Sequence, residues 1–250
     1  MKAQLPLRFE LRDDYRLDTF VPGTNGALCA RLLALGSAAN TGSDAGSDNR
    51  LGDMLWLYGA QGSGKTHLLQ ATVAELAPAR LASTDHYEIA YFPARQIAVA
   101  DAVDALEGSE RYALLCIDDV DCWLGVAAVE QELVRRYQER RQAGLHLLLS
   151  ANRPPGEYAM AVADWASRAR GAEVFRLAEL SDDDKLAVLE ARASRLGLVL
   201  GGATSTYLLR HGPRSLPAML DVLAQADKLA MAEQRNLTVP LLKKVLQAQS

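Results

Sequence analysis

The residues with the clearest chemistry form a glycine-rich segment, Gly59-Ala60-Gln61-Gly62-Ser63-Gly64-Lys65-Thr66, between an apolar run and a helical pattern. This is the form of a P-loop, in which glycines permit a tight turn and backbone N–H groups at a helix start surround phosphates. Lys65 supplies charge for the β- and γ-phosphates, and Thr66 a hydroxyl for Mg²⁺. The alternative is a glycine-rich turn that binds nothing. We expect a bound nucleotide here, contacted by Gln61, Gly62, Ser63, Gly64, Lys65, Thr66 and His67.

Two adjacent carboxylates end another apolar run, Leu114-Leu115-Cys116-Ile117-Asp118-Asp119. The run predicts a buried strand that delivers Asp118 to its carboxyl end, where the carboxylate can organise Mg²⁺ and water. Asp119 is then placed to polarise an attacking water as general base. Acidic residues that merely end a strand are the alternative. The P-loop about fifty residues upstream favours a Walker B strand.

A neutral amide follows the next apolar strand, at Asn152. Pro154 and Pro155 force an extended exit from that strand, which places Asn152 at the end of the sheet where the γ-phosphate would lie. The amide could orient a water molecule for hydrolysis. The alternative is an asparagine that only caps a turn.

Strand and helix patterns alternate along residues 54–177. We predict strands over 54–58, 88–92, 112–117, 146–150 and 173–177. We predict helices over 27–35, 65–77, 95–106, 127–143 and 160–168. Near-continuous apolar strands separated by helices imply an α/β fold, a parallel five-stranded sheet with helices on both faces.

After about residue 180 the patterns are helical only. Ser181 and Asp184 predict a capped helix start, and Thr238 with Pro240 another. Helices are expected to 196 and over 203–211, 215–232 and 238–248. We therefore expect a tail over 1–14, a nucleotide-binding α/β domain over 15–179 with a flexible loop at 36–53, and a small all-helical domain over 180–250.

Composition narrows the class of protein. The 250 residues carry a net charge of −4, which lowers the expectation of strong autonomous DNA binding. The three cysteines lack C-x-x-C spacing and the four histidines are scattered, so a His/Cys metal centre is not indicated. No membrane span or signal peptide is recognisable. We expect a reduced, cytoplasmic protein.

The order of these motifs resembles the AAA+ ATPases of the bacterial replication-initiator clade. Phe20-Val21-Pro22-Gly23-Thr24-Asn25, the P-loop, the acidic pair and Asn152-Arg153-Pro154-Pro155 follow in the clade's order. Asp164-Trp165-Ala166-Ser167-Arg168 is similar to its arginine-finger box. Residues 180–185 resemble the start of its helical lid, and Gly212-Pro213-Arg214 the lid segment with the sensor-2 arginine.

The resemblance implies roles for particular residues. Phe20, Val21, Pro22 and Gly23 would contact the base and ribose of ADP or ATP, and Arg214 its phosphates. Arg168 would act in trans on ATP bound by the initiator DnaA, since an arginine finger stabilises charge on the transferring phosphoryl group. The alternatives are a solvated Arg214, and an Arg168 or Arg170 held in a surface salt bridge.

Within the clade, two features are similar to the Hda family, the regulatory relatives of DnaA. The chain leaves no room after the lid for a DNA-binding domain of about 100 residues. It also begins with Gln4-Leu5-Pro6-Leu7-Arg8-Phe9, which resembles the Q-x-x-L-x-F peptide that docks on the DNA polymerase III sliding clamp (β subunit). Gln4 would form hydrogen bonds at the rim of the clamp's binding pocket, while Leu5, Leu7 and Phe9 would contact its apolar cleft.

The resemblance thus implies a regulatory protein that binds the DNA-loaded clamp and stimulates hydrolysis of DnaA-bound ATP. DNA contact would be mostly indirect, and a homo-oligomer is compatible with the family. Intact Lys65, Thr66, Asp118 and Asp119 leave open whether the chain hydrolyses its own nucleotide. An autonomous ATPase or loader-type motor, and a nucleotide-gated adaptor without catalysis, are the alternatives; a small-molecule kinase fits the helical lid region least.

Overall fold

The computed structural model describes residues 15–17, 20–37, 52–80, 89–233 and 236–248. The expected clamp-binding residues Gln4, Leu5, Leu7 and Phe9 and most of the loop expected at 36–53 lie outside these ranges. The described chain divides into two compact units, one holding Asn25–Ala178 and the other Glu179 onward together with Phe20–Thr24. None of the described helices is long and apolar enough to cross a membrane.

The first unit contains a five-stranded parallel sheet of order β2-β3-β4-β1-β5. Its strands are β1 (Met54–Tyr58), β2 (Ile89–Pro93), β3 (Leu114–Asp118), β4 (His146–Ala151) and β5 (Glu173–Arg176). Because all strands are parallel, their carboxyl ends lie along one edge of the sheet. The expected fold class and strand number are confirmed.

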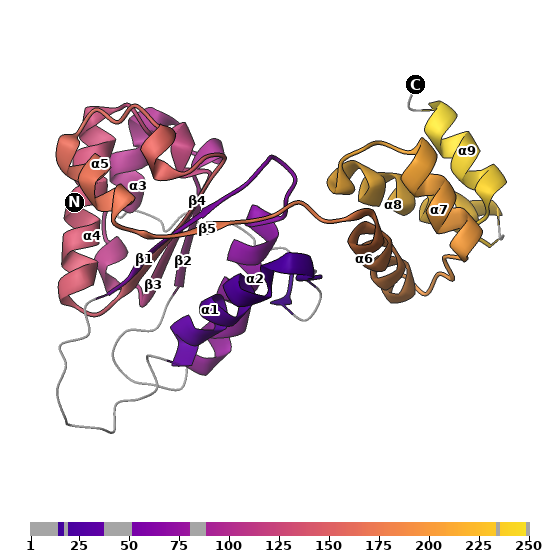
Figure 1. Cartoon of the computed structure of the whole chain (residues 1–250), viewed down its shortest axis with the longest axis horizontal. Helices are drawn as coiled ribbons and strands as arrows, with labels where there is room; N and C mark the ends of the chain where they lie inside the picture. The colour runs from indigo at the N-terminus through magenta and orange to yellow at the C-terminus, as the bar shows by residue number, and fades with distance from the viewer. Residues whose placement is uncertain (1–14, 18–19, 38–51, 81–88, 234–235, 249–250) are drawn as a thin grey trace. The chain divides into compact units, whose positions relative to one another are not determined.

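Helices cover both faces of this sheet (Figure 1). On one face lie α1 (Gly26–Ser37) and α2 (Lys65–Arg80). On the other lie α3 (Ala102–Leu106), α4 (Ala127–Gln142) and α5 (Ala163–Arg170). Helix α2 starts directly after the glycine-rich segment and packs against β2, β3 and β4, so the sheet and the segment are held together.

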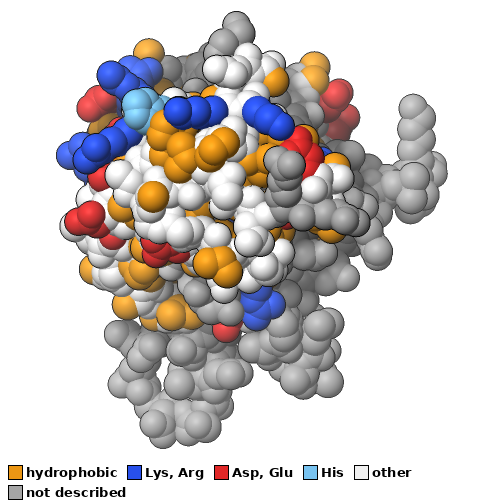
Figure 2. Space-filling model, turned by 90° about the vertical axis from the view of Figure 1, so that its right-hand side faces the viewer, with side chains coloured by type: hydrophobic (Ala, Val, Ile, Leu, Met, Phe, Trp, Pro, Cys, Tyr) orange, Lys and Arg blue, Asp and Glu red, His pale blue; other side chains and the backbone are white. Residues whose placement is uncertain are grey.

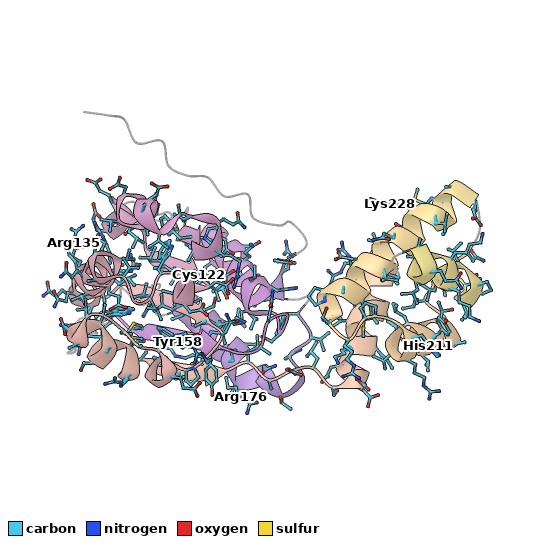
Figure 3. All side chains as sticks on the ribbon, turned by 90° about the horizontal axis from the view of Figure 1, so that it is seen from above. Cys122, Arg135, Tyr158, Arg176, His211 and Lys228 are labelled. Atoms are coloured by element: carbon cyan, nitrogen blue, oxygen red, sulfur yellow. The ribbon has the colours of Figure 1, made fainter. Side chains whose placement is uncertain are left out.

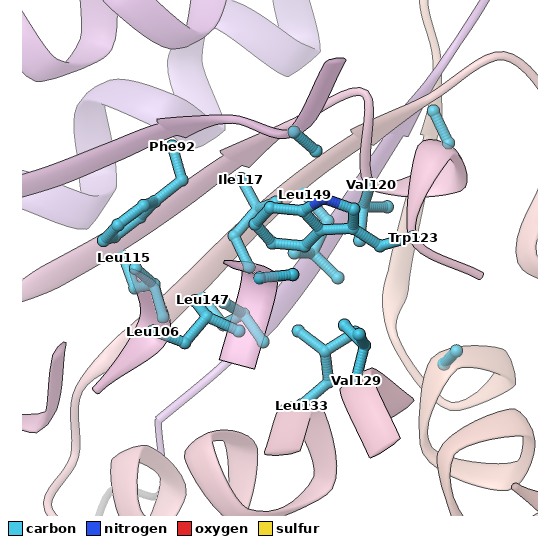
Figure 4. Close-up of a cluster of buried hydrophobic side chains, with 14 of the residues drawn as sticks. Phe92, Leu106, Leu115, Ile117, Val120, Trp123, Val129, Leu133, Leu147 and Leu149 are labelled. Atoms are coloured by element: carbon cyan, nitrogen blue, oxygen red, sulfur yellow. The ribbon is translucent and has the colours of Figure 1, made fainter. Parts of the chain in front are cut away.

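Alternation along each strand divides the core between the two faces. Trp56, Ile117 and Leu149 join one buried cluster with Trp123 of the following loop and Leu133 of α4 (Figure 4). The residues between them along the strands point to the other face of the sheet, which α2 covers; they include Cys116, Asp118 and Ser150. The strand period therefore decides which polar side chains reach the P-loop.

One expected helix, over 95–106, is wrong in most of its length. Only α3 is α-helical, and short 3-10 turns occupy Ala94–Gln96 and Val99–Asp101. Ile97 is extended (φ −108°, ψ 123°) and interrupts the expected helix. Helix α1 runs to Ser37, two residues into the expected loop.

The second unit is a bundle of α6 (Asp182–Arg195), α7 (Gly202–His211), α8 (Leu216–Glu233) and α9 (Val239–Ala248) around its own buried cluster. The predicted capping box is confirmed: Ser181 Oγ accepts from Asp184 N, and Asp184 Oδ2 accepts from Ser181 N. Gly23, grouped with this unit, has φ +50°, and a Cβ there would lie 3.0 Å from Asp184 Oδ2. Backbone conformation and close approach thus both favour glycine at this position.

Candidate nucleotide site at the carboxyl edge of the sheet

The glycine-rich segment links β1 to α2 and has the backbone conformation of a phosphate-binding loop. Gly62 (φ 81°) and Gly64 (φ 102°) adopt left-handed conformations that side chains disfavour. A Cβ on Gly59 would lie 2.7 Å from Leu177 O, so only glycine fits against the end of β5. The helix that follows leaves its first N–H groups without intrahelical acceptors, which suits an anion.

Lys65 is buried, and its ammonium is held inside this loop. Nζ donates to Gly59 O (2.8 Å), Ala60 O (3.1 Å) and Asn152 Oδ1 (3.2 Å). Burial lowers the pKa of Lys65, against the opposing effect of nearby carboxylates, chiefly Asp119. The ammonium and the Asn152 amide are therefore neighbours.

Asp118 is fixed by two hydroxyl groups at the end of β3. Its Oδ2 accepts from Tyr91 Oη of β2 at 2.8 Å, and its Oδ1 accepts a short bond from Ser150 Oγ of β4. Gln70 of α2 donates to the same Tyr91 oxygen at 3.2 Å. Burial, then the charge of Asp118, raises the pKa of Tyr91 far above its ordinary value, so Tyr91 stays a neutral donor. These contacts hold the carboxylate in one orientation.

Asp119 occupies a left-handed conformation (φ 54°, ψ 45°) directly after the strand. Its N–H donates to Ser150 Oγ at 2.9 Å, so one serine hydroxyl contacts both aspartates. Its Oδ2 forms a 2.9 Å ion pair with Arg95, whose side chain is 58% exposed. The carboxylate expected as a general base is therefore engaged by a cation that can move into solvent.

Asn152 uses both ends of its amide, because Nδ2 donates to Asp121 Oδ2 at 2.8 Å while Oδ1 accepts from Lys65. Tyr158 Oη donates to the same Asp121 oxygen at 3.1 Å. The turn-capping alternative does not describe these contacts, which join the loop after β4 to the P-loop lysine.

Arg168 lies near the end of α5 and is paired on its own helix. Its Nε lies 3.0 Å from Asp164 Oδ1, and its guanidinium carbon is 5.5 Å from the ring centre of Tyr137. The salt-bridge alternative is thus the arrangement seen in this structure. Arg170, two residues on, is exposed.

The other expected contacts are distributed between the units. Thr66 and His67 lie in the first turn of α2, where the His67 ring stacks on Tyr15 with ring centres 4.6 Å apart. Phe20, Val21, Pro22, Gly23 and Arg214 all belong to the second unit.

Tyr91, Arg95, Asp121 and Ser150 contact the predicted site residues but were not predicted from the sequence. Two of them left a signal. Ser150 is polar within an apolar strand, and Asp121 is a third carboxylate in Asp118-Asp119-Val120-Asp121. Tyr91 and Arg95 have no such mark, because only strand order places β2 beside β3.

The residues present fit a phosphate chain with a magnesium ion. Among described residues, no group of three or more His, Cys, Asp or Glu side chains could hold a metal by itself. Mg²⁺ bound to a nucleotide takes one or two protein ligands and completes its shell with phosphates and water. Thr66 and Asp118 are the candidate ligands.

The serine that joins the two aspartates provides a test of this geometry. Ser150→Ala removes the buried donor to Asp118 and leaves the partly buried Asp119 N–H unpaired, so we expect a loss of about 1–3 kcal/mol in the free energy of unfolding. Ser109→Ala is the matched control, because Ser109 is equally buried but its Oγ has no partner in the described structure. Urea denaturation measures both variants, and an equal loss in each would contradict a structural role for the Ser150 bonds.

Comparisons with known proteins agree with this architecture. A family model described as the bacterial DnaA ATPase domain matches residues 11–170, and one described as the Hda lid domain matches residues 182–246. Domain III of the Thermotoga maritima replication initiation protein DnaA is similar in structure, with a TM-score of 0.76 and 18% identity, covering 96% of this chain and 98% of that one.

Two further structures share the fold. AMPPCP-bound DnaA from Aquifex aeolicus gives a TM-score of 0.69 and 20% identity over 89% of this chain and 67% of that one. The RuvB Holliday junction branch migration motor of Thermotoga maritima gives 0.63 and 16%, over 89% and 68%. At these identities the structures support the fold, and the family models support the family. The chain belongs to the family of the bacterial DnaA ATPase domain and, with its Hda-type lid, is an Hda-like AAA+ protein.

Proposed function

We propose that this chain is a regulatory AAA+ protein that binds adenine nucleotide, docks on the DNA-loaded sliding clamp and stimulates hydrolysis of DnaA-bound ATP. It would thereby limit re-initiation of chromosome replication in the cytoplasm. The observation that carries the proposal is a complete P-loop and acidic pair in a DnaA-type ATPase domain followed by an Hda-type lid. The autonomous ATPase and the adaptor remain the competing functions.

In this proposal Lys65 and the N-terminus of α2 hold the phosphates, while Thr66 and Asp118 hold Mg²⁺. The metal would neutralise charge on the phosphate oxygens. The related Aquifex DnaA structure contains AMPPCP, which supports an adenine nucleotide as the ligand. Lys65 must exchange loop carbonyls for phosphate oxygens when the nucleotide binds.

The Asp119–Arg95 ion pair favours regulation over autonomous turnover. While Arg95 donates to Oδ2, that oxygen is occupied and is less available to accept from a water molecule. The intact acidic pair nevertheless supports the second candidate, an autonomous ATPase or loader-type motor. Comparing the turnover of the isolated protein with turnover in the presence of clamp, DNA and DnaA separates the two functions.

The charge distribution supports an indirect relation to DNA. The chain carries a net charge of −4. On the face shown in Figure 2, several basic side chains gather at the upper left, and acidic and apolar side chains lie beside and below them. We therefore assign DNA contact chiefly to the clamp.

We assign the stimulation of ATP hydrolysis to Arg168, which must first leave its ion pair with Asp164.

Nucleotide binding predicts a rise in melting temperature that grows with the concentration of Mg²⁺–ADP, because the ligand binds only the folded state. Lys65→Ala should abolish most of this shift. Lys228→Ala, an exposed lysine of α8 labelled in Figure 3, is the control and should leave it intact. Differential scanning fluorimetry measures all three proteins. A full shift in Lys65→Ala would exclude Lys65 from the site.

Clamp docking predicts that Leu7 and Phe9 are anchor residues. Replacing both by Ala should weaken clamp binding by at least about 30-fold, since truncation of an interface anchor removes ~2 kcal/mol or more. Arg8→Ala, between the anchors in sequence, is the control. Surface plasmon resonance on immobilised clamp measures the affinities. Wild-type affinity in a chain without residues 1–9 would show that the motif match is accidental.

The trans-acting finger predicts a separation of functions. Arg168→Ala should keep nucleotide and clamp binding but lose stimulated hydrolysis of DnaA-bound ATP, because a finger in trans contributes ~10³–10⁵ in rate. Arg170→Ala on the same helix should keep stimulation. Hydrolysis is followed with radiolabelled ATP on DnaA in the presence of loaded clamp. Full stimulation by Arg168→Ala would contradict the mechanism and would leave Arg170 or Arg153 as the candidate finger.

A further inference from the structure

Asp121 borders the candidate site at the end of the Asn152 amide opposite Lys65, and it belongs to none of the predicted motifs. It lies in the short 3-10 helix η6 (Val120–Cys122), which follows the left-handed turn at Asp119. Its Oδ2 accepts from Asn152 Nδ2 (2.8 Å) and Tyr158 Oη (3.1 Å). Its Oδ1 is buried without a hydrogen-bond partner in the described structure.

These contacts determine which way the Asn152 amide faces. An ionised carboxylate only accepts hydrogen bonds, and an ammonium only donates them. With Asp121 on one side and Lys65 on the other, the amide must direct Nδ2 to Asp121 and Oδ1 to Lys65. After a 180° rotation of the amide, the Asn152 NH₂ group would face the Lys65 ammonium, donor against donor. The amide oxygen would face the Asp121 carboxylate, acceptor against acceptor.

Tyr158 holds Asp121 in place for this role. Its hydroxyl donates to Asp121 and accepts from Arg153 N–H at 2.9 Å. Tyr158 comes from the segment after β4, and Cys122, next to Asp121, from the segment after β3; both are labelled in Figure 3. The carboxylate is therefore fixed from the same loop that carries Asn152.

We propose that Asp121 is a positioning residue that makes Asn152 an obligate hydrogen-bond acceptor toward the phosphate end of the nucleotide. The inference rests on the proposed nucleotide binding at the P-loop. Lys65, which serves the β- and γ-phosphates, lies 3.2 Å from Asn152 Oδ1. An amide oxygen there can accept from the ammonium or from a water molecule but cannot donate to a phosphate oxygen. Asp121 thus influences how the site distinguishes a terminal γ-phosphoryl group from its absence.

Removal of the carboxylate should release the amide. In Asp121→Ala the Asn152 amide can rotate and direct Nδ2 to a γ-phosphate oxygen. The ratio Kd(Mg²⁺–ADP)/Kd(Mg²⁺–AMPPCP) should therefore rise about tenfold, the effect of about one hydrogen bond. Isothermal titration calorimetry measures both constants. A variant that only loosened the fold would weaken both ligands by one factor and leave the ratio unchanged.

Three further variants control the experiment. Tyr158→Phe removes the other donor to Asp121 and should change the ratio in the same direction by a smaller factor. Asp101→Ala, at an exposed carboxylate, should keep the wild-type ratio. In an Asn152→Ala background, Asp121→Ala should change the ratio no further. Asp121→Ser, whose shorter side chain does not reach Asn152, replaces Asp121→Ala if that variant does not fold.

Side-chain NMR tests the same contact in the protein without nucleotide. The Asn152 Nδ2 protons, assigned by their loss in Asn152→Ala, should resonate downfield in the wild type. They should move upfield in Asp121→Ala but not in Asp101→Ala. An unmoved resonance, or an unchanged ligand ratio, overturns the proposal. If the wild type binds neither nucleotide, the proposed function fails, whereas the NMR result still decides the role of Asp121.

Discussion

The candidate site depends on how strands β3 and β4 end beside each other. Their parallel pairing places Ser150 next to the acidic pair, and the serine hydroxyl contacts both the Asp118 carboxylate and the Asp119 amide. A hydroxyl is the smallest side-chain group that can donate to one neighbour and accept from another. The Asp118 carboxylate and the Asp119 backbone therefore take their positions from the sheet itself, and the surrounding contacts only adjust them.

The left-handed residue after β3 is the second constraint. Asp119 is the single described non-glycine residue with positive φ, a conformation that is disfavoured for side chains and that aspartate tolerates better than most. After this turn, the carboxylates of Asp119 and Asp121 contact different partners. Asp119 meets Arg95, and Asp121 meets Asn152. The local backbone thus separates two acidic side chains that are close in sequence.

Much of the fold could be predicted because its signals are local. Apolar runs gave the five strands, and Ser181 with Asp184 gave the start of α6. The glycine spacing likewise indicated the P-loop. The features that could not be predicted depend on tertiary structure. The segment 95–106 has helical composition, but after Pro93 it forms two separate 3-10 turns before the short helix α3. Contacts of Tyr91 and Arg95 with the site could not be predicted, because they depend on the strand order that places β2 beside β3. No short segment of the sequence determines that order.

The internal contacts of Lys65 have a consequence for ligand exchange. Two loop carbonyls and an amide oxygen accept hydrogen bonds from the ammonium, so the chain itself contains oxygens that compete with phosphate for Lys65. A competitor tethered within the same chain acts at a high effective concentration that dilution cannot reduce. Each departing phosphate can be replaced at once by these oxygens. The Lys65 ammonium is therefore not left buried without a partner when the ligand leaves. The segment that held the ligand can keep its fold.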